Sequence, residues 1–385
     1  FIRGTNKNFW VFKVKLIMAG TKEKGSFKEI ISPFLKSKIQ DLKKDYGVDS
    51  KEYFAVASQY LQSKKENYSS NIERTRHYES NVEVSYEGMP LVGVERLYKP
   101  TILIEPTTVC AAHCRWCLRG QYPIQTMKKE EIVRATKYMS SKENKKDVFE
   151  VLITGGDPLM SLPLLKFTLE QIEKNAPNIS IIRIGTRVPF QDPERINDGM
   201  LELFSSFKKF RFEAGINVNH PLEFWDESIK SIKKLQNIGF KIYNQNPLLK
   251  GVNDSFSTLV ELYSKLREND IEAHYLFHAI PMVGTSHHRT SLKTGYDLTR
   301  RLSSCGLFSG RTKPKYAVLS DIGKIVIYED TVIKKRPEDN SLLLNSGFNY
   351  NERIKWNPSW RKPQSVELAK DGNMHTWYLD GDDKK

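Results

Sequence analysis

Three of the four cysteines in this chain lie within eight consecutive residues, at Cys110, Cys114 and Cys117. Three thiolates at this C-x3-C-x2-C spacing can hold three irons of a four-iron cluster and leave the fourth iron without a protein ligand. That open iron can then bind a small molecule. A structural zinc site needs four ligands, so zinc would require His113 or a distant residue as well. His113 adjoins Cys114, which makes joint ligation by the two awkward.

The same three cysteines could be core residues without a metal, because free cysteine packs as a small apolar side chain. Their neighbours include His113, Arg115 and Arg119, and charged or polar residues of this kind are rare in a core. We therefore favour a ligand loop. The fourth cysteine, Cys305, lies far from the loop, and we expect it to be a core residue. Clustered cysteines fit a reducing compartment better than a disulfide scaffold, which predicts a cytoplasmic protein.

The cysteine loop follows the first of six short apolar runs that are rich in β-branched residues. These runs are Thr101–Glu105, Phe149–Thr154, Ser180–Gly185, Phe210–Val218, Phe240–Gln245 and Ala273–His278. Helical sequence separates most of them, at Lys128–Met139, Leu162–Lys174, Pro193–Phe207, Glu223–Ile238 and Phe256–Glu268, with Thr126 and Asp254 as helix N-caps. The alternation predicts parallel strands joined by right-handed crossovers. Six such units predict an α/β fold, a partial (βα)6 barrel.

In barrels, ligands collect at the carboxyl ends of the strands, and the unusual polar motifs of this chain follow strands. After the cysteine loop come Gly155-Gly156-Asp157-Pro158, Thr186-Arg187, Asn219-His220-Pro221 and Asn244-Gln245-Asn246, behind the second to fifth runs. Each motif alone is weak, because a glycine pair usually marks a turn. Their shared rim predicts a ligand site. There the glycines would let backbone approach a ligand, and Asp157 could accept a hydrogen bond from an ammonium group.

The segments outside the barrel have other patterns. Apolar residues recur at helical intervals in Phe27–Tyr46 and Lys51–Lys65, so we expect a helical N-terminal cap over residues 1–96, followed by the barrel at 97–290. Residues 291–385 form a C-terminal extension rich in hairpin and loop structure. Within it we expect a helix over Tyr296–Leu307, a hairpin over Tyr316–Val332 and an irregular tail.

Composition excludes two classes of protein. The 385 residues are 39% hydrophobic, which argues against a disordered chain. No apolar run approaches the about 20 residues needed to cross a bilayer. The formal net charge of +14 favours anionic partners, but the lysines are dispersed, which is typical of solvated surface.

From about Pro100 to Thr290 the order of motifs resembles the lysine 2,3-aminomutase branch of the radical S-adenosylmethionine (radical SAM) enzymes. The residues that carry the resemblance are the cysteine loop with Trp116 and Arg119, Leu152–Leu159, Ile182–Arg187, Asn219–Pro221, Asn244-Gln245, Leu248–Asp254 and His288–Thr290. The resemblance implies a 4Fe-4S cluster on Cys110, Cys114 and Cys117, with S-adenosylmethionine on the open iron. It also implies a cofactor pocket lined by Gly155, Gly156, Asp157, Thr186, His220 and Gln245.

The resemblance further implies a reaction and its partners. Reductive cleavage of S-adenosylmethionine would give a 5′-deoxyadenosyl radical that abstracts hydrogen from the substrate. Arg119 matches the residue that pairs with the substrate carboxylate, a contact that suits a guanidinium group. The implied partners are a small-molecule substrate and a reductant such as flavodoxin or ferredoxin.

The chain departs from that family at two places. Ile280 stands where the family has an aspartate that helps to hold the substrate's side-chain amine, so we do not expect free lysine as the substrate. Family aminomutases also carry pyridoxal phosphate on a lysine that ends a glycine-rich loop. Lys324 aligns with that lysine only if most of the glycines are deleted. Alternatively, Ser320–Asp330 aligns with a later hairpin and the loop is absent.

We favour the hairpin alignment, because the alternating apolar neighbours of Lys324 explain it as an exposed hairpin position. Pyridoxal phosphate is therefore a doubtful cofactor. Three functions remain open: a radical SAM enzyme acting on a carboxylate-bearing, amino-acid-like substrate, a pyridoxal-phosphate-dependent 2,3-aminomutase that uses Lys324, and a zinc-stabilised nucleic-acid-binding protein. The third would suit the positive charge but would leave the strand-end motifs unexplained.

Overall fold

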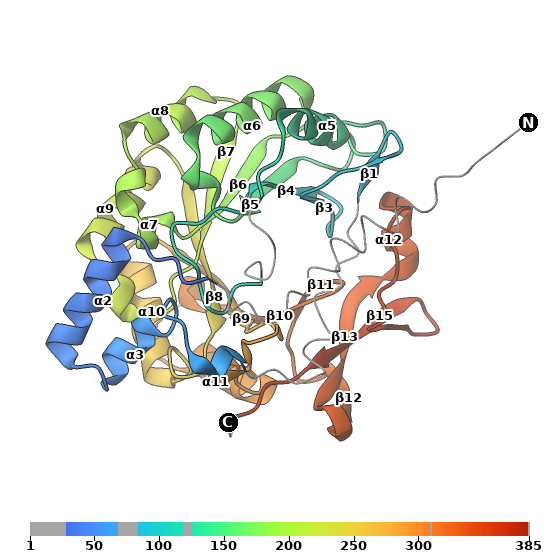
Figure 1. The fold of residues 1–385 in the computed structure, drawn as a ribbon. Helices are drawn as coiled ribbons and strands as arrows, with labels where there is room; N and C mark the ends of the chain where they lie inside the picture. The colour runs from blue at the N-terminus through green and yellow to red at the C-terminus, as the bar shows by residue number, and fades with distance from the viewer. Residues whose placement is uncertain (1–27, 68–83, 119–124, 309, 384–385) are drawn as a thin grey trace, which may run out of the picture.

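The computed structural model describes residues 28–67, 84–118, 125–308 and 310–383, and in these residues one curved nine-stranded sheet forms the centre of the molecule (Figure 1). The strand order is β11-β10-β9-β8-β7-β6-β5-β4-β3. Strands β4 to β10 are parallel to their neighbours, and β3 and β11 are antiparallel strands at the two edges. The sheet is therefore an open, partial barrel, and the predicted fold class is confirmed.

The six predicted parallel strands are all present, with small shifts at their ends. The sheet comprises β3 (Val94–Glu95), β4 (Thr101–Thr107), β5 (Glu150–Gly155), β6 (Ile181–Thr186), β7 (Arg211–Ile216), β8 (Lys241–Leu248), β9 (Glu272–His278), β10 (Lys315–Ser320) and β11 (Gly323–Val326). In β5, Val151 and Ile153 are fully buried, whereas Leu152 and Thr154, which each follow one of them, are partly exposed. This period of two separates a helix-covered outer face from the barrel interior.

Helices cover the outer face of the sheet (Figure 1). They are α5 (Lys129–Met139), α6 (Leu162–Asn175), α7 (Val188–Gln191), α8 (Asp198–Ser206), α9 (Asp226–Asn237), α10 (Phe256–Glu268) and α11 (Leu292–Ser304). The predicted helix over Pro193–Phe207 is divided into a short 3-10 turn, η4 (Pro193–Arg195), and α8. Most of these helices contribute their buried apolar side chains to one hydrophobic core, which extends from β4 to β11.

Both predicted helix N-caps are wrong. Helix α5 is capped at Lys128, whose backbone amide donates to the Glu131 carboxylate (2.7 Å), and Thr126 lies before the cap. Helix α10 is capped by Ser255, because the carboxylate of Asp254 accepts the Gly251 amide (2.9 Å) instead. The Thr126 hydroxyl instead contacts the Thr107 hydroxyl of β4 (3.2 Å), and the Asp254 carboxylate is satisfied within its own loop.

The described N-terminal cap contains α2 (Pro33–Tyr46) and α3 (Lys51–Ala57), so the predicted helical character holds there. Their apolar sides form a second, smaller core that also contains Cys114 and Trp116. Residues 84–95 continue as short strands, β1 (Ser85–Tyr86), β2 (Met89–Pro90) and β3, rather than as helix. The cap therefore packs directly on the cysteine loop.

The C-terminal extension is more regular than the sequence predicted. The hairpin is confirmed as β10 and β11, but β10 also pairs in parallel with β9 and so extends the barrel sheet. The expectation of an irregular tail is wrong. The tail forms a second sheet in the order β12-β13-β15-β14, built from β12 (Val332–Arg336), β13 (Ser341–Asn349), β14 (Val366–Leu368) and β15 (Asn373–Leu379), with α12 (Tyr350–Trp356) in one connection.

This second sheet forms because its strands carry a buried apolar face. The composition of the tail as a whole did not indicate this face. Met374, Thr376 and Tyr378 alternate as buried residues along β15, and the buried residues Leu344 and Leu342 of β13 pair with Thr376 and Tyr378. Long-range pairing of this kind leaves little local signal in the sequence. Among the residues that the structure describes, no helix has the length and apolar content to cross a bilayer.

Candidate active site at the carboxyl ends of the parallel strands

The three predicted cluster ligands lie together on the loop that follows β4. Cys114 is buried, and Cys110 and Cys117 are partly exposed. Burial raises the pKa of the Cys110 thiol, and Asp157 and the other two thiols raise it further. As placed, no group of three or more His, Cys, Asp or Glu side chains in the described part of the chain could hold a metal ion. The donor set, three thiols on one loop, nevertheless fits a four-iron cluster with one open iron.

The N-terminal segment fastens the cysteine loop by backbone hydrogen bonds. The His113 amide donates to the Ile30 carbonyl, and the Arg115 amide donates to the Gln59 carbonyl, each over 2.8 Å. The Arg115 guanidinium also forms a buried ion pair with Glu66. The position of the loop therefore depends on residues that precede the barrel.

Gly155 and Gly156, at the end of β5, are held against the backbone that enters the cysteine loop. A Cβ atom on Gly155 would lie 2.2 Å from the Thr107 carbonyl oxygen, and one on Gly156 would lie 2.3 Å from the Val109 carbonyl oxygen. Gly155 also has a φ of +123°, which disfavours any side chain. The Gly156 amide donates to the Thr107 carbonyl (2.8 Å). These two glycines therefore allow the end of β5 to pack closely against the backbone at the start of the cysteine loop.

Asp157 links the end of β5 to the end of β6. Its carboxylate accepts hydrogen bonds from Thr186 Oγ1 (2.9 and 2.8 Å) and from the amides of Arg187 (2.8 Å), Val188 (3.2 Å) and Leu159 (3.1 Å). Burial raises the pKa of Asp157 to about 6, although these hydrogen bonds favour the charged form. The donors fill the about four acceptor positions of a carboxylate. In this structure Asp157 therefore fixes the turn between β6 and α7.

His220 caps the short 3-10 turn η5 (Pro221–Glu223) that follows β7. Its Nδ1 accepts the Leu222 amide (3.2 Å), which leaves the ring proton on Nε2. Burial lowers the pKa of His220, so the ring is neutral at pH 7. A neutral ring with Nε2–H can donate one hydrogen bond to a ligand.

Gln245 on β8 meets Lys324 of β11. The Lys324 ammonium donates to Gln245 Oε1 (3.3 Å), and its Nζ lies 5.1 Å from the centre of the Tyr275 ring and 5.4 Å from that of Phe277. Burial, together with a smaller effect of the nearby Arg183 charge, lowers the pKa of Lys324 to about 8. These contacts come from β8 and β9, so the Lys324 side chain faces the interior of the barrel.

The prediction that Lys324 is an exposed hairpin position was therefore wrong. The hairpin itself is present, and Lys324 pairs with Leu319 across it. A hairpin strand has two faces, and the period of two does not say which of them faces inward. Because β10 joins the barrel sheet, the Lys324 face became part of the barrel interior.

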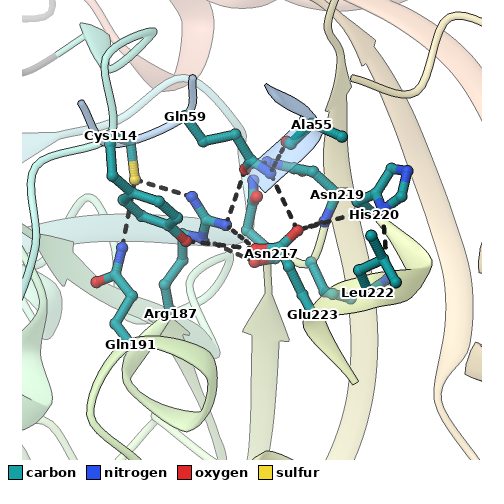
Figure 2. Close-up of polar contacts among 12 residues, drawn as sticks. Ala55, Gln59, Cys114, Arg187, Gln191, Asn217, Asn219, His220, Leu222 and Glu223 are labelled. Carbon is teal, nitrogen blue, oxygen red and sulfur yellow. Dashed lines mark hydrogen bonds and ion pairs between the residues drawn. The ribbon is translucent and has the colours of Figure 1, made fainter. Parts of the chain in front are cut away.

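Two other positions, Arg119 and Ile280, were predicted to determine the choice of substrate. Arg119, predicted to pair with the substrate carboxylate, lies outside the described residues. Ile280, in place of the family's aspartate, follows β9 and is partly exposed, and its carbonyl accepts the Met282 amide (2.9 Å). The structure does bring the ends of β5, β6 and β7 to the cysteine loop, through Asp157, Thr186 and a buried network around Cys114 (Figure 2).

That network contains residues that the sequence did not single out. Arg187 was placed in a strand-end motif without being assigned a role. Gln59 and Glu223 were assigned neither a motif nor a role. Gln59 and Glu223 are each one polar residue in helical sequence, so only the fold brings them into contact. Their near-complete burial is the signal that identifies them, and it is visible only in three dimensions.

Comparison with known proteins agrees with this geometry. The family model described as Radical SAM superfamily matches residues 104–263, from the first parallel strand to α10. The chain is 32% identical over 236 residues to an L-lysine 2,3-aminomutase of Methanococcus maripaludis, covering 60% of this chain and 53% of that protein. It is 31% identical over 235 residues to a glutamate 2,3-aminomutase of Clostridioides difficile, covering 60% of this chain and 53% of that protein.

Among solved structures, a radical SAM methyltransferase from Sphaerobacter thermophilus is 16% identical, covers 58% of this chain and 68% of that chain, and gives a TM-score of 0.44. The chain spans between about half and two thirds of the length of the curated relatives that it matches. The matched segment contains the three-cysteine loop and the strand ends that surround it. Residues 104–263 therefore form a radical SAM domain, and the chain is similar to lysine 2,3-aminomutases that carry such a domain.

Proposed function

We propose that this protein is a radical SAM enzyme that abstracts hydrogen from a carboxylate-bearing, amino-acid-like substrate and rearranges it. The observation that carries the proposal is the three-cysteine loop, fixed at the carboxyl end of β4 inside the segment that the family model matches. Cys110, Cys114 and Cys117 would hold a 4Fe-4S cluster. When bound, the cluster and S-adenosylmethionine supply one-electron chemistry that generates a carbon radical.

The chain's own residues would position the cofactor and keep water away from it. Gly155 and Gly156 hold the base of the cysteine loop, and Asp157 with Thr186 fixes the neighbouring strand end. His220 can donate from Nε2. Gln245 lies further into the barrel, on β8. We assign six residues to the S-adenosylmethionine pocket, namely Gly155, Gly156, Asp157, Thr186, His220 and Gln245.

The substrate class follows from two positions. Arg119 would pair with the substrate carboxylate, as a guanidinium does in two parallel hydrogen bonds. Ile280 would place an apolar side chain where an amine-bearing substrate needs an anion, and an unpaired buried ammonium is costly. We therefore infer that free lysine is not the substrate. We also infer a cytoplasmic enzyme that takes electrons from a reductant such as flavodoxin or ferredoxin.

The substrate assignment is tested by incubating the reconstituted enzyme with a panel of amino acids and measuring 5′-deoxyadenosine and deuterium exchange. We expect at least one carboxylate-bearing amino acid to stimulate product formation about tenfold, and lysine to have little effect, because a missing polar partner costs about 1–3 kcal/mol. Ile280→Asp should raise the response to lysine. Lysine as the best substrate of the unmodified enzyme would contradict this assignment.

A second candidate function is a 2,3-aminomutase that carries pyridoxal phosphate on Lys324. The observation that favours it is the position of Lys324 in the barrel interior, with its pKa lowered to about 8 by burial. A lysine amine that is desolvated and near a second cation is suited to attack a carbonyl group. Lys324→Arg would keep the positive charge but could not form the covalent link. The two candidates therefore differ in whether this variant loses pyridoxal phosphate.

A further inference from the structure

A buried polar network touches Cys114 and lies largely outside the residues that the proposed function uses (Figure 2). Its members come from the N-terminal cap, the cysteine loop, the end of β6 with α7, and η5. They are Gln59, Tyr60, Cys114, Arg187, Gln191, Asn219 and Glu223, and all seven side chains are buried. We call this group the thiol network.

Arg187 is the centre of the thiol network. Its Nη1 donates to Cys114 Sγ (2.9 Å), its Nη2 donates to Glu223 Oε1 (2.8 Å), and its Nε donates to the Asn217 carbonyl (2.9 Å). All three guanidinium nitrogens are thus engaged at once. Because the guanidinium is planar, these contacts fix the direction of the N–H group that points at the sulfur.

Aromatic rings hold the same guanidinium from two neighbouring segments. Its central carbon lies 5.2 Å from the centre of the Tyr60 ring and 5.5 Å from that of Trp116. Trp116 stands between Cys114 and Cys117 in the sequence. Cation–π contacts at buried sites favour the charged guanidinium and restrict its motion.

Glu223 compensates the charge of Arg187 and ties the network to the N-terminal cap. Its carboxylate also accepts hydrogen bonds from the Tyr60 hydroxyl (3.3 Å), Gln59 Nε2 (3.3 Å) and the Asn219 amide (2.8 Å). Gln59 Oε1 in turn accepts from Arg187 Nη2 (3.2 Å). The cap therefore helps to set the orientation of the arginine that contacts the cysteine.

Cys114 Sγ receives a second donor, Gln191 Nε2, at 3.4 Å. Two N–H groups therefore point at one sulfur, one of them from a cation. Hydrogen bonds to ionised acceptors are roughly twice as strong as those between neutral groups, so this arrangement suits a thiolate. The other two cysteines lie closer to solvent.

We propose that Arg187 is a positioning residue that holds the Cys114 thiolate and raises the reduction potential of a 4Fe-4S cluster bound through it. Hydrogen bonds to a ligand sulfur and nearby positive charge stabilise the more negative, reduced cluster. The N-terminal cap acts on the cluster through Gln59 and Tyr60. This inference rests on the proposed function, because it requires a cluster on the cysteine loop.

The test is a redox titration of the anaerobically reconstituted full-length protein, followed by the paramagnetic resonance signal of the reduced cluster. Arg187→Gln removes the charge, and we expect its potential to become more negative. The expected size is an about tenfold fall in the ratio of reduced to oxidised cluster at a fixed potential, about 59 mV for one electron. Arg187→Lys keeps the charge and should restore part of the shift.

Two further variants separate this role from a structural one. Gln191→Leu removes only the second donor and should give a smaller shift in the same direction. Arg353→Gln removes a buried arginine of the C-terminal extension, whose guanidinium donates to the Ile322 carbonyl, and should leave the potential unchanged.

The outcomes distinguish the inference from the function on which it rests. A wild-type potential in both Arg187→Gln and Gln191→Leu, with full cluster content, would overturn the inference. If Arg187→Gln takes up no cluster, the reduction potential of Gln191→Leu decides: a more negative potential supports the inference, and a wild-type potential overturns it. If the unmodified protein takes up no iron and sulfide, the proposed function fails instead.

Discussion

Lys324 has an amine whose chemistry depends on its surroundings. An ordinary lysine side chain titrates near pH 10.4, but burial beside Arg183 lowers the pKa of Lys324 to about 8. The neutral amine is the nucleophilic form, and it is present above the pKa. At pH 8 about half of the Lys324 side chains would be neutral, whereas ordinary lysines would be almost fully charged.

Labelling with pyridoxal phosphate and borohydride should therefore be selective at moderate pH. We expect modification of the Lys324 peptide to rise with pH through an apparent pKa of about 8 and then level off, as measured by peptide mass spectrometry. In Lys324→Arg this component should vanish, while the other lysines keep rising at higher pH. Modification of Lys324 that increases only near the ordinary lysine pKa of about 10 would contradict the buried, pKa-lowered amine.

Single residues could be assigned roles from the sequence where their types alone carry chemistry, and these assignments stay predictions. The three cysteines were assigned as ligands from spacing, and the polar residues at strand ends were grouped from their order along the chain. The face of Lys324 could not be assigned, because both faces of a strand share the same period. The hydrogen bonding of the Asp157 carboxylate could not be predicted either. The five hydrogen bonds that it accepts depend on the geometry of the loops that follow β5 and β6.

At the scale of elements, the end of β5 and the start of the cysteine loop act as one unit. Gly156 has no room for a side chain, because its Cβ would lie 2.3 Å from both the Thr108 carbonyl carbon and the Val109 carbonyl oxygen. Both contacts are to backbone, so a larger residue must displace the segment that carries Cys110.

Gly156→Ala should therefore lower the free energy of unfolding by about 1–3 kcal/mol and reduce iron and sulfide uptake. Denaturant unfolding and metal analysis of the reconstituted protein measure the two effects. The matched control is Gly306→Ala, at an exposed glycine where an added Cβ would have no other atom within 4 Å, and it should change neither by much. Normal cluster uptake by a destabilised Gly156→Ala would show that the loop tolerates the displacement.

Elements with strong local patterns were predicted, and elements defined by distant partners were not. The six apolar runs gave six strands because a parallel, helix-covered strand is apolar over most of its length. The hairpin over β10 and β11 was also found, yet the parallel pairing of Lys315 with Tyr275 was not, since it joins segments about 40 residues apart. The second sheet was missed for the same reason.

At the scale of the molecule, the segments before and after the barrel both contribute side chains to the site. The cysteine motif alone does not predict these contributions. The N-terminal cap supplies Gln59 and Tyr60 to the thiol network, and the C-terminal extension supplies Lys324 to the barrel interior. Arg289, which lies between β9 and α11, donates to the carbonyl of Asp380 (3.1 Å), directly after β15, and so ties the end of the second sheet to the barrel. We infer that the site needs the described segments together rather than the family-matched portion alone.

The most direct test of the central claim is anaerobic reconstitution with iron and sulfide, reduction with dithionite, and chromatography for 5′-deoxyadenosine formed from S-adenosylmethionine. We predict cluster binding and cofactor cleavage in the unmodified protein and in Cys305→Ala, and loss of both in Cys114→Ala. Retained cleavage in Cys114→Ala, or zinc in place of iron and sulfide in the unmodified protein, would contradict that claim.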